Sequence, residues 1–455
     1  MILDPFPYQQ AAIKYLLKRP QFALIADCGL GKTCIFINLF NRLKEEGKAK
    51  RMLVFCPRSV MKTAWLEDVA KFSNLSIDII WHKNYQKRLD ILKNSQADIC
   101  VVNYNVANKM KFDLIDKKFD MIVLDESTFI KNPTAKTTKA VLLIGKQIHY
   151  RYIATATPGH KEERYWSQYI FIDPDIWDRK NFYKFREKYF YEIDLGDGLK
   201  KYVFNQSYTD EIRKRIRDNS YFLKKEQCAK HLPDRVFLKR MIDMPPTVMK
   251  SYKQMKKDYV WDDVVAFFSP SQRQKLRQMA NGYVIEDERG REKKIHVLHK
   301  EKLKELKYIL EDVIPEDEQV LIWSQFVEEA EVISREIGCE KITGLSKDPI
   351  TIIDKFKSGE IKRVVCHPQS VSHGITWIKC HYCIYFGLTE DTELLSQGMD
   401  RIHRVGQMNT CFYYFLLSSG TIDESIFNSH VKNKNKELFL IRKNDTSVLY
   451  KTGII

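Results

Sequence analysis

Short runs of apolar residues recur along the first third of the chain, and stretches of helical length separate them. The runs are Phe22–Ala26, Met52–Cys56, Ile99–Val102 and Met121–Leu124. Continuous apolar runs of this length, bounded by polar or turn-forming residues, are typical of strands that are buried on both faces. Their alternation with helices predicts a doubly wound parallel sheet.

The same alternation returns near residue 300, with the apolar runs Val320–Trp323, Arg363–Cys366, Tyr382–Phe386 and Thr410–Phe415. The intervening stretch, 175–295, is rich in Lys, Arg and aromatic residues, and its periodicity is mostly helical. We therefore expect an α/β fold of two parallel-sheet lobes, over 1–174 and 296–455, with a helical insertion over 175–295 between them.

The charge of the chain points to an anionic partner. Among 455 residues there are 75 Lys and Arg against 59 Asp and Glu, and the net charge is +16. Nucleic acid is the first partner to consider for such an excess. The alternative is a basic surface that is only solvated.

Two further features indicate the compartment. The first ten residues lack the basic and apolar segments of a secretory signal, and no apolar run reaches the ~18 residues of a membrane helix. The ten cysteines show no disulfide framework, which suits a reducing compartment. We expect a cytoplasmic protein associated with DNA, or a nuclear one if its source is eukaryotic.

The pair Cys380 and Cys383 lies in an apolar run without a second ligand pair, so a buried strand is favoured over a zinc site.

The sharpest local signal is the segment Ala26 to Thr33, which follows one predicted strand and opens a predicted helix. This is the context of a phosphate-binding loop. Cys28, Gly29, Leu30 and Gly31 would present backbone N–H groups to the phosphates. Lys32 would reach the β- and γ-phosphates, and the hydroxyl of Thr33 would ligate Mg²⁺.

A second signal is the acidic pair Asp125 and Glu126 at the end of an apolar run. Asp125 fits a Mg²⁺ ligand, and Glu126 fits the carboxylate that polarises the attacking water.

A third signal is the segment 397–407, in which Arg401 and Arg404 lie three residues apart and would share a face of a helical turn. Such arginines can supply positive charge to a phosphate site, and the alternative is a solvated basic face.

Together these segments resemble the superfamily-two helicases, and within them the Swi/Snf-related ATPases that translocate on double-stranded DNA. The segments that carry the resemblance, in the family's order, are 27–33, 53–59 with Trp65, 125–132, 155–158, 321–326 and 400–407. The resemblance extends from Tyr8-Gln9 to Gln407. It implies two RecA-like lobes that bind ATP and Mg²⁺ between them, with double-stranded DNA as the partner and no membrane.

The resemblance also assigns roles to single residues. Gln9 would read the adenine edge, while Thr155, Thr157 and Gln397 would couple the nucleotide state to the grip on nucleic acid. Arg401 and Arg404 would reach across from the second lobe, with Arg404 as the finger on the γ-phosphate. The residues that correspond to nucleic-acid contacts are Arg58, Tyr104, Ser324, Gln325, Thr343, Gly344 and His373.

The chain departs from the family pattern at several positions. Thr128 stands where many members have His, and Ala156 where many have Gly. Lys224-Lys225 occupies the place of a frequent Arg-Arg pair, and the segment 368–374 diverges from the usual glycine-rich form.

The sequence is compatible with three functions. The first is an ATP-dependent translocase on double-stranded DNA, a compact bacterial or viral monomer that acts in repair, recombination or replication. The second is a strand-separating DNA or RNA helicase, which the large insertion disfavours. The third is a nucleotide-gated DNA-binding scaffold with little turnover, which the intact nucleotide residues disfavour.

Overall fold

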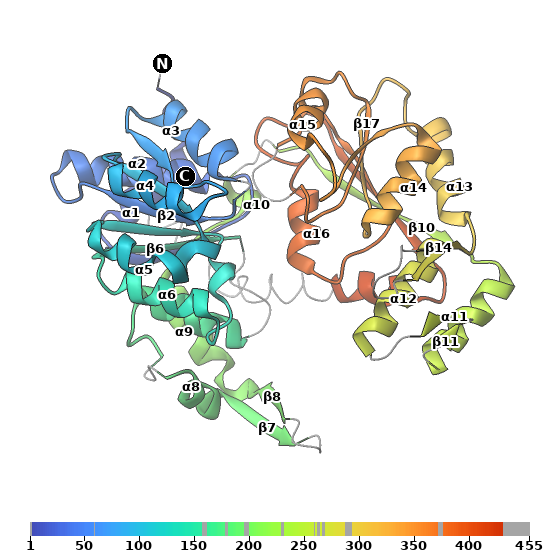
Figure 1. Cartoon of the computed structure of the whole chain (residues 1–455), viewed down its shortest axis with the longest axis horizontal. Coiled ribbons are helices and arrows are strands. Elements are labelled where there is room, and N and C mark those ends of the chain that lie inside the picture. Colours follow the sequence, from blue (N-terminus) through green and yellow to red (C-terminus); the bar gives the residue numbers. More distant parts are fainter. Residues whose placement is uncertain are drawn as a thin grey trace. The chain divides into compact units, whose positions relative to one another are not determined.

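The computed structural model of the chain describes residues 2–58, 60–156, 162–177, 181–194, 200–228, 232–258, 260–261, 264–265, 269–286, 294–371 and 376–430. It divides into two compact units, with the division between Lys230 and His231 (Figure 1). No helix in these described ranges is both long and apolar enough to cross a membrane.

Unit 1 is built on a seven-stranded parallel sheet whose middle strands are buried on both faces. The order of its strands is β3 (Ile77–Ile79), β4 (Ile99–Asn103), β2 (Met52–Cys56), β5 (Met121–Asp125), β6 (Tyr150–Thr155), β1 (Gln21–Ala26) and β9 (Ser220–Leu223). Alternate residues face opposite layers, so that Leu53 and Phe55 join one apolar core while Met52 and Val54 join the other.

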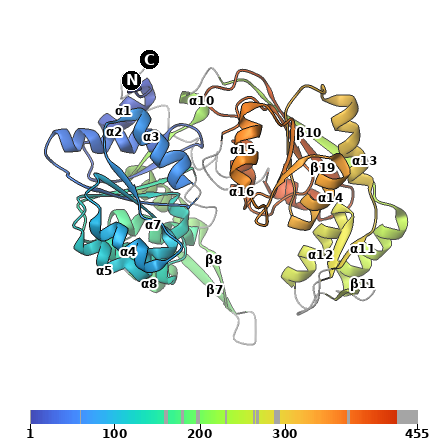
Figure 2. The same ribbon diagram turned by 45° about the horizontal axis from the view of Figure 1, so that its top comes forward.

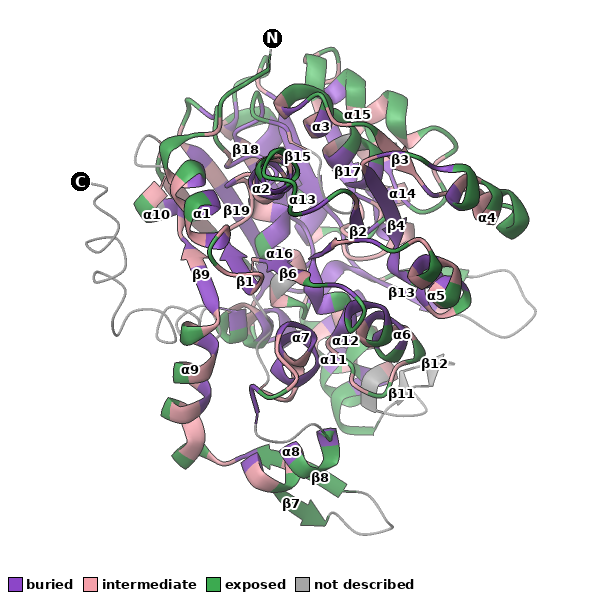
Figure 3. Ribbon diagram, turned by 90° about the vertical axis from the view of Figure 1, so that its left-hand side faces the viewer, coloured by how far each residue is buried: buried purple, intermediate pink, exposed green. Residues whose placement is uncertain are grey.

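Helices cover both faces of this sheet. One core contains side chains of α1 (Pro7–Leu16), α2 (Lys32–Glu45) and α3 (Glu67–Phe72), and the opposite core contains those of α4 (Tyr85–Asn94), α5 (Ala107–Asp116), α6 (Lys136–Gly145) and α7 (Tyr165–Ile172). Figure 3 shows the strands as largely buried and the outer faces of these helices as exposed. Unit 1 also contains α8 (Phe182–Tyr189), α9 (Thr209–Asp218), α10 (Lys225–Cys228) and an antiparallel hairpin of β7 (Phe190–Asp194) and β8 (Lys200–Phe204).

Unit 2 is built on a six-stranded parallel sheet of the same kind (Figure 2). The order is β10 (Arg235–Ile242), β19 (Cys411–Ser418), β18 (Tyr382–Tyr385), β15 (Val320–Trp323), β17 (Arg363–Cys366) and β16 (Glu340–Ile342). One face packs against α13 (Glu301–Tyr308) and α14 (Val327–Ile337), and the other against α11 (Pro246–Asp258), α12 (Ser269–Asn281), α15 (Pro349–Ser358) and α16 (Thr392–Met399). Two further hairpins pair β11 (Val260–Trp261) with β12 (Val264–Val265) and β13 (Tyr283–Glu286) with β14 (Lys294–Val297).

The prediction of two parallel-sheet lobes is confirmed, and each of the eight apolar runs contains a strand. Cys383 lies in β18 and both it and Cys380 are buried, as expected for a strand. The middle stretch differs from a helical insertion. Its strand β9 joins the sheet of unit 1 and its strand β10 joins that of unit 2, so the division between the units falls inside 175–295. Both strands lie at the edges of their sheets.

Candidate functional site

The loop from Asp27 to Gly31 joins β1 to α2 in the way that the sequence predicts for a phosphate-binding loop. Gly29 and Gly31 have φ angles of 86° and 74°, a backbone region that residues with a side chain rarely adopt. A Cβ atom on Gly31 would also lie 2.2 Å from Nε2 of Gln9. The loop therefore needs glycine at Gly31 for two separate reasons.

Gln9 holds α1 against this loop. Its Nε2 donates a hydrogen bond to the carbonyl of Leu30 at 3.0 Å, and its Oε1 accepts one from the backbone N–H of Phe6 at 2.9 Å. The side chain is buried, so its amide is fixed beside the glycine turn. The contact of Gln9 with an adenine edge stays a prediction.

Lys32 is the first residue of α2 and Thr33 is the second. The ammonium of Lys32 donates to the carbonyl of Ala26 at 3.0 Å, so the side chain folds back over the loop. Its positive charge also reaches Asp125, whose pKa it lowers. The loop, Lys32 and the acidic pair thus belong to one electrostatic environment.

Asp125 ends β5, and its Oδ2 accepts a hydrogen bond from the indole N–H of Trp65 at 2.9 Å. Burial raises the pKa of this carboxyl to about 6, against the opposing effects of Lys32 and Trp65. A carboxylate whose charge is incompletely compensated fits a divalent cation, and Mg²⁺ in nucleotide sites needs only one or two such ligands besides the phosphates. Asp125 and Thr33 are the residues that would hold it.

Glu126 is buried and has a left-handed backbone, with φ 59° and ψ 60°. A residue other than glycine adopts this conformation at a cost, and such residues gather at functional sites. Oε1 of Glu126 accepts hydrogen bonds from the hydroxyls of Thr128 and Thr155, each over 3.3 Å. The direction of the carboxylate is therefore fixed by two neutral donors.

The topology explains why these groups meet. In the parallel sheet, β6 lies between β5 and β1, with Asp125 beside Ala154 and Thr155 beside Ile25. The acidic pair, Thr155 and the phosphate loop consequently occupy the carboxyl ends of three neighbouring strands. Ligands bind at this edge of open α/β sheets. The structure brings together the sequence-predicted nucleotide residues of unit 1, except Thr157, which lies outside the described residues.

The predicted nucleic-acid contacts of unit 1 divide into one exposed and one buried residue. Arg58 is exposed, and its guanidinium lies 4.1 Å from the ring centroid of Trp81. Tyr104 is buried, and its hydroxyl donates to the carbonyl of Asp125 at 2.9 Å. The buried ring of Tyr104 therefore supports Asp125, and a nucleic-acid contact at this position stays a prediction.

Unit 2 carries Gln397 and the two predicted arginines. Gln397 is buried within α16, which ends at Met399, so Arg401 and Arg404 lie in the turns beyond it. The Arg401 side chain is buried, whereas Arg404 is half-buried and donates from Nη1 to Thr376 Oγ1 at 2.8 Å and from Nε to the Asp400 carbonyl at 3.0 Å. This corrects the expectation of one shared helical face. Arg404 is the better placed of the two to meet a ligand.

The other predicted contacts of unit 2 also differ in exposure. Ser324 is buried, and both its N–H and its hydroxyl donate to the carbonyl of Cys366. Thr343 is buried as well, with its hydroxyl accepting from the N–H of Leu345 at 3.3 Å. These hydroxyls therefore hold the local backbone, and the contacts of these two segments with nucleic acid stay predictions. Gln325 is partly exposed and Gly344 is exposed, while His373 lies outside the described residues.

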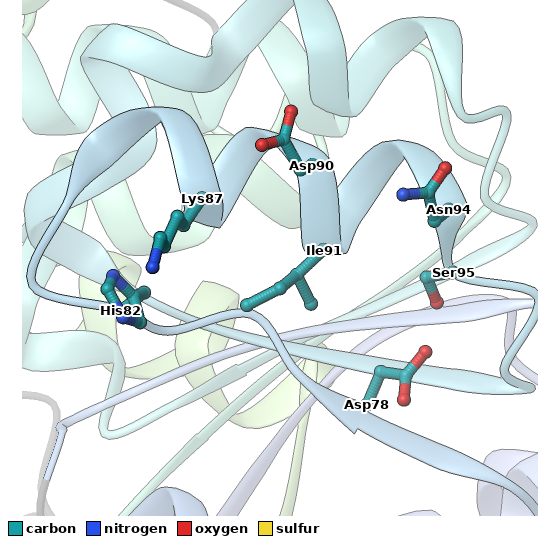
Figure 4. Close-up of a pocket in the computed structure, with 7 residues that line it drawn as sticks. All are labelled: Asp78, His82, Lys87, Asp90, Ile91, Asn94 and Ser95. Atoms are coloured by element: carbon teal, nitrogen blue, oxygen red, sulfur yellow. The ribbon is translucent and has the colours of Figure 1, made fainter.

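A separate pocket of about 510 Å³ lies between β3 and α4 (Figure 4). Its walls include Asp78, Asp90 and Lys87, and none of its lining residues was predicted as a site. Because β4 and β2 separate β3 from β5, this pocket is not part of the nucleotide site.

Sequence reasoning assigned no role to Trp65 or Thr128, although both stand in the segments that resemble the family. The signal was available in part, since Thr128 is a departure from the pattern. It also missed the contact of Asp27 with Lys224, because those residues are 197 positions apart.

Comparisons with known proteins identify the family of this chain. The SNF2-related domain matches residues 8–287, and the helicase conserved C-terminal domain matches residues 301–406. YwqA of Bacillus subtilis is 24% identical to this chain, over 92% of the chain and 47% of YwqA. The human DNA annealing helicase and endonuclease ZRANB3 is 22% identical, over 92% of the chain and 38% of ZRANB3.

The chain spans less than half the length of these two relatives. Among solved structures, the SWI2/SNF2 ATPase core of Sulfolobus solfataricus in complex with dsDNA is 24% identical, with a TM-score of 0.46, and the match covers 100% of this chain and 97% of that one. The match to the SNF2-related domain covers more than half of the sequence. This chain belongs to the SNF2-related family.

Proposed function

We propose that this chain hydrolyses ATP with Mg²⁺ and uses the energy to translocate on double-stranded DNA. The observation that carries the proposal is the convergence of Lys32, Asp125 and Glu126 at one edge of the sheet. Lys32 and Asp125 influence each other electrostatically, and Glu126 is directed by two hydroxyls. Phosphoryl transfer requires little more than such positioning and charge compensation.

Each residue of the site has a separate task in this proposal. The loop and Lys32 bind the phosphates, and the carboxylate of Glu126 orients the water that attacks the terminal phosphorus. Thr33 and Asp125 hold Mg²⁺, which supplies positive charge to the phosphate oxygens when it is bound. Thr155 connects the position of Glu126 to β6, and Arg404 adds a second positive charge from unit 2.

Duplex DNA is the favoured track for three reasons. The net charge of +16 suits a polyanion, and contacts with phosphates give affinity without sequence preference. Arg58 is an exposed cation on unit 1. Finally, the chain belongs to a family in which one similar protein is named a DNA annealing helicase.

The test measures phosphate release with duplex DNA, single-stranded DNA, forked DNA and RNA in turn. We expect the strongest stimulation by duplex DNA, and no turnover in Glu126→Gln although ATP still binds. A triplex-displacement assay should detect movement along the duplex, with little unwinding of forks. Efficient fork unwinding without triplex displacement would instead support a strand-separating helicase. DNA binding without phosphate release would support a scaffold.

A further inference from the structure

Asp27, at the start of the phosphate loop, is bound to three consecutive residues that follow in unit 1 almost 200 positions later. Its Oδ1 accepts a hydrogen bond from the ammonium of Lys224 at 2.9 Å. Its Oδ2 accepts from the backbone N–H of Lys225 at 3.0 Å, and its own N–H donates to the carbonyl of Leu223 at 3.1 Å. The loop and this distant segment are therefore linked at one residue.

The segment that Asp27 holds is the short helix α10. Lys225 is its first residue, and the first N–H groups of a helix have no partner within it, so the Asp27 carboxylate caps α10. The N–H groups of Gln227 and Cys228 then donate to the carbonyl of Lys224 at 3.1 and 2.9 Å. Cys228 packs into the same apolar core as Tyr8, the neighbour of Gln9. The helix thus packs against the core of unit 1 as well as against Asp27.

Helix α10 lies near the end of unit 1 in the sequence. Unit 1 ends at Lys230 and unit 2 begins at His231, so α10 is the last described helix before the chain enters unit 2. The Asp27–Lys224 pair is partly exposed, with 28% and 18% of the two side chains accessible. Partly exposed ion pairs contribute little to folding, so the contact can be rearranged at small cost.

Nucleotide binding would change the charge around this pair. The phosphates would bring negative charge to the loop that carries Asp27, and this charge would repel the Asp27 carboxylate and weaken its hold on Lys224. A weakened hold on Lys224 would alter the start of α10, which is the last described helix before unit 2.

We propose that Asp27 and Lys224 form a linkage through which nucleotide in the phosphate loop acts on α10, the last described helix of unit 1. Lys224 is a positioning residue in this linkage, since it acts through Asp27 and α10. The inference rests on the proposed ATP-driven function, because it explains how occupancy of one unit reaches the other.

The experiment compares Lys224→Ala and Lys224→Arg in the full chain with the control Lys214→Ala. Lys214 is an exposed lysine of α9, so its replacement removes the same charge without disturbing α10. Spectroscopic labels at the exposed positions Lys146 in unit 1 and Lys357 in unit 2 report the distance between the units. A non-hydrolysable ATP analogue is then added, and ATP affinity, basal turnover and duplex-stimulated turnover are measured beside it.

In the wild type and in Lys214→Ala, the analogue should change the distance between the labels. In Lys224→Ala, basal turnover should stay unchanged and ATP affinity should change by less than about tenfold, while the distance change disappears and DNA stimulation falls about tenfold. Lys224→Arg should restore both. A full distance change in Lys224→Ala would overturn the linkage, as would loss of ATP binding, which would make Lys224 a nucleotide ligand. Because the analogue needs no hydrolysis, this readout is independent of turnover, whereas a wild type without turnover would refute the proposed function alone.

Discussion

The hydroxyl of Thr155 donates a hydrogen bond to Oε1 of Glu126 across 3.3 Å, from the strand next to the one that ends in the acidic pair. Thr128 donates to the same oxygen from the turn that follows Glu126. Both threonines are buried, so the two hydrogen bonds do not compete with solvent. The residue predicted to couple nucleotide state to movement therefore touches the residue predicted to activate water.

Thr155→Val and Thr128→Val should each lower turnover at saturating ATP by about 10- to 100-fold, because each removes one hydrogen bond that directs Glu126. The affinity for ATP should not change, since neither hydroxyl is assigned to the nucleotide. Phosphate release and nucleotide binding measure the two quantities. Serine at either position keeps the hydroxyl and should keep most of the turnover. Unchanged turnover in both valine variants would show that Glu126 needs no such support.

The rate of ATP hydrolysis should fall as the pH drops below about 6, the value to which burial raises the pKa of Asp125. Only the ionised carboxylate can hold Mg²⁺, and protonation removes it. Trp65→Phe removes an N–H that favours the ionised form, so this variant should lose turnover at a higher pH than the wild type. The measurement is a pH–rate profile at saturating ATP and at Mg²⁺ below saturation, where a proton on Asp125 competes with the metal. An identical acid limb in the two proteins would show that Asp125 does not set it.

The sequence predicts the central strands well because a strand buried on both faces is a continuous apolar run. The same pattern does not identify the strands at the edges of the sheets. In strand β10, Lys239 and Arg240 interrupt the apolar residues, and the side chains of Phe237 and Met241 are exposed, so the strand is not one continuous apolar run.

The site shows the same limit. Sequence motifs locate Lys32, Asp125 and Glu126, since Lys32 follows a glycine loop after one strand and the acidic pair lies at the end of another. They cannot tell that Tyr104 and Ser324 are buried, because this depends on packing against residues that are distant in the sequence. The partner of Asp27 likewise becomes known only when β9 is placed beside β1.

Arg404→Ala should reduce turnover, whereas Arg401→Ala should reduce stability. Arg404 is half-buried, and its loss should reduce turnover roughly 10³-fold while unit 2 stays folded, as for arginines that act on a γ-phosphate. Arg401 is buried, and its loss should lower the free energy of unfolding, because a buried side chain with its contacts is removed. Chemical denaturation and phosphate release separate the two effects. Equal destabilisation by both variants would remove Arg404 from the catalytic site.

The last prediction concerns a buried ion pair in unit 2. Lys302 of α13 donates to Asp423 Oδ2 at 2.6 Å, to Asn281 Oδ1 at 2.8 Å and to the carbonyl of Phe386 at 3.1 Å. The side chains of Lys302 and Asp423 are only 0% and 2% accessible. All three N–H groups of the ammonium are therefore used, and its charge is compensated inside the fold.

Lys302→Met should lower the free energy of unfolding of unit 2 by about 3–5 kcal/mol, because it leaves the Asp423 carboxylate buried without its partner. Lys302→Met combined with Asp423→Asn should recover part of this loss, since no uncompensated charge remains. Lys304→Met on the same helix breaks only the exposed pair with Glu301 and should cost at most about 1 kcal/mol. Urea denaturation of the four proteins measures these differences. If Lys302→Met were as stable as Lys304→Met, the buried pair of Lys302 and Asp423 would not stabilise unit 2.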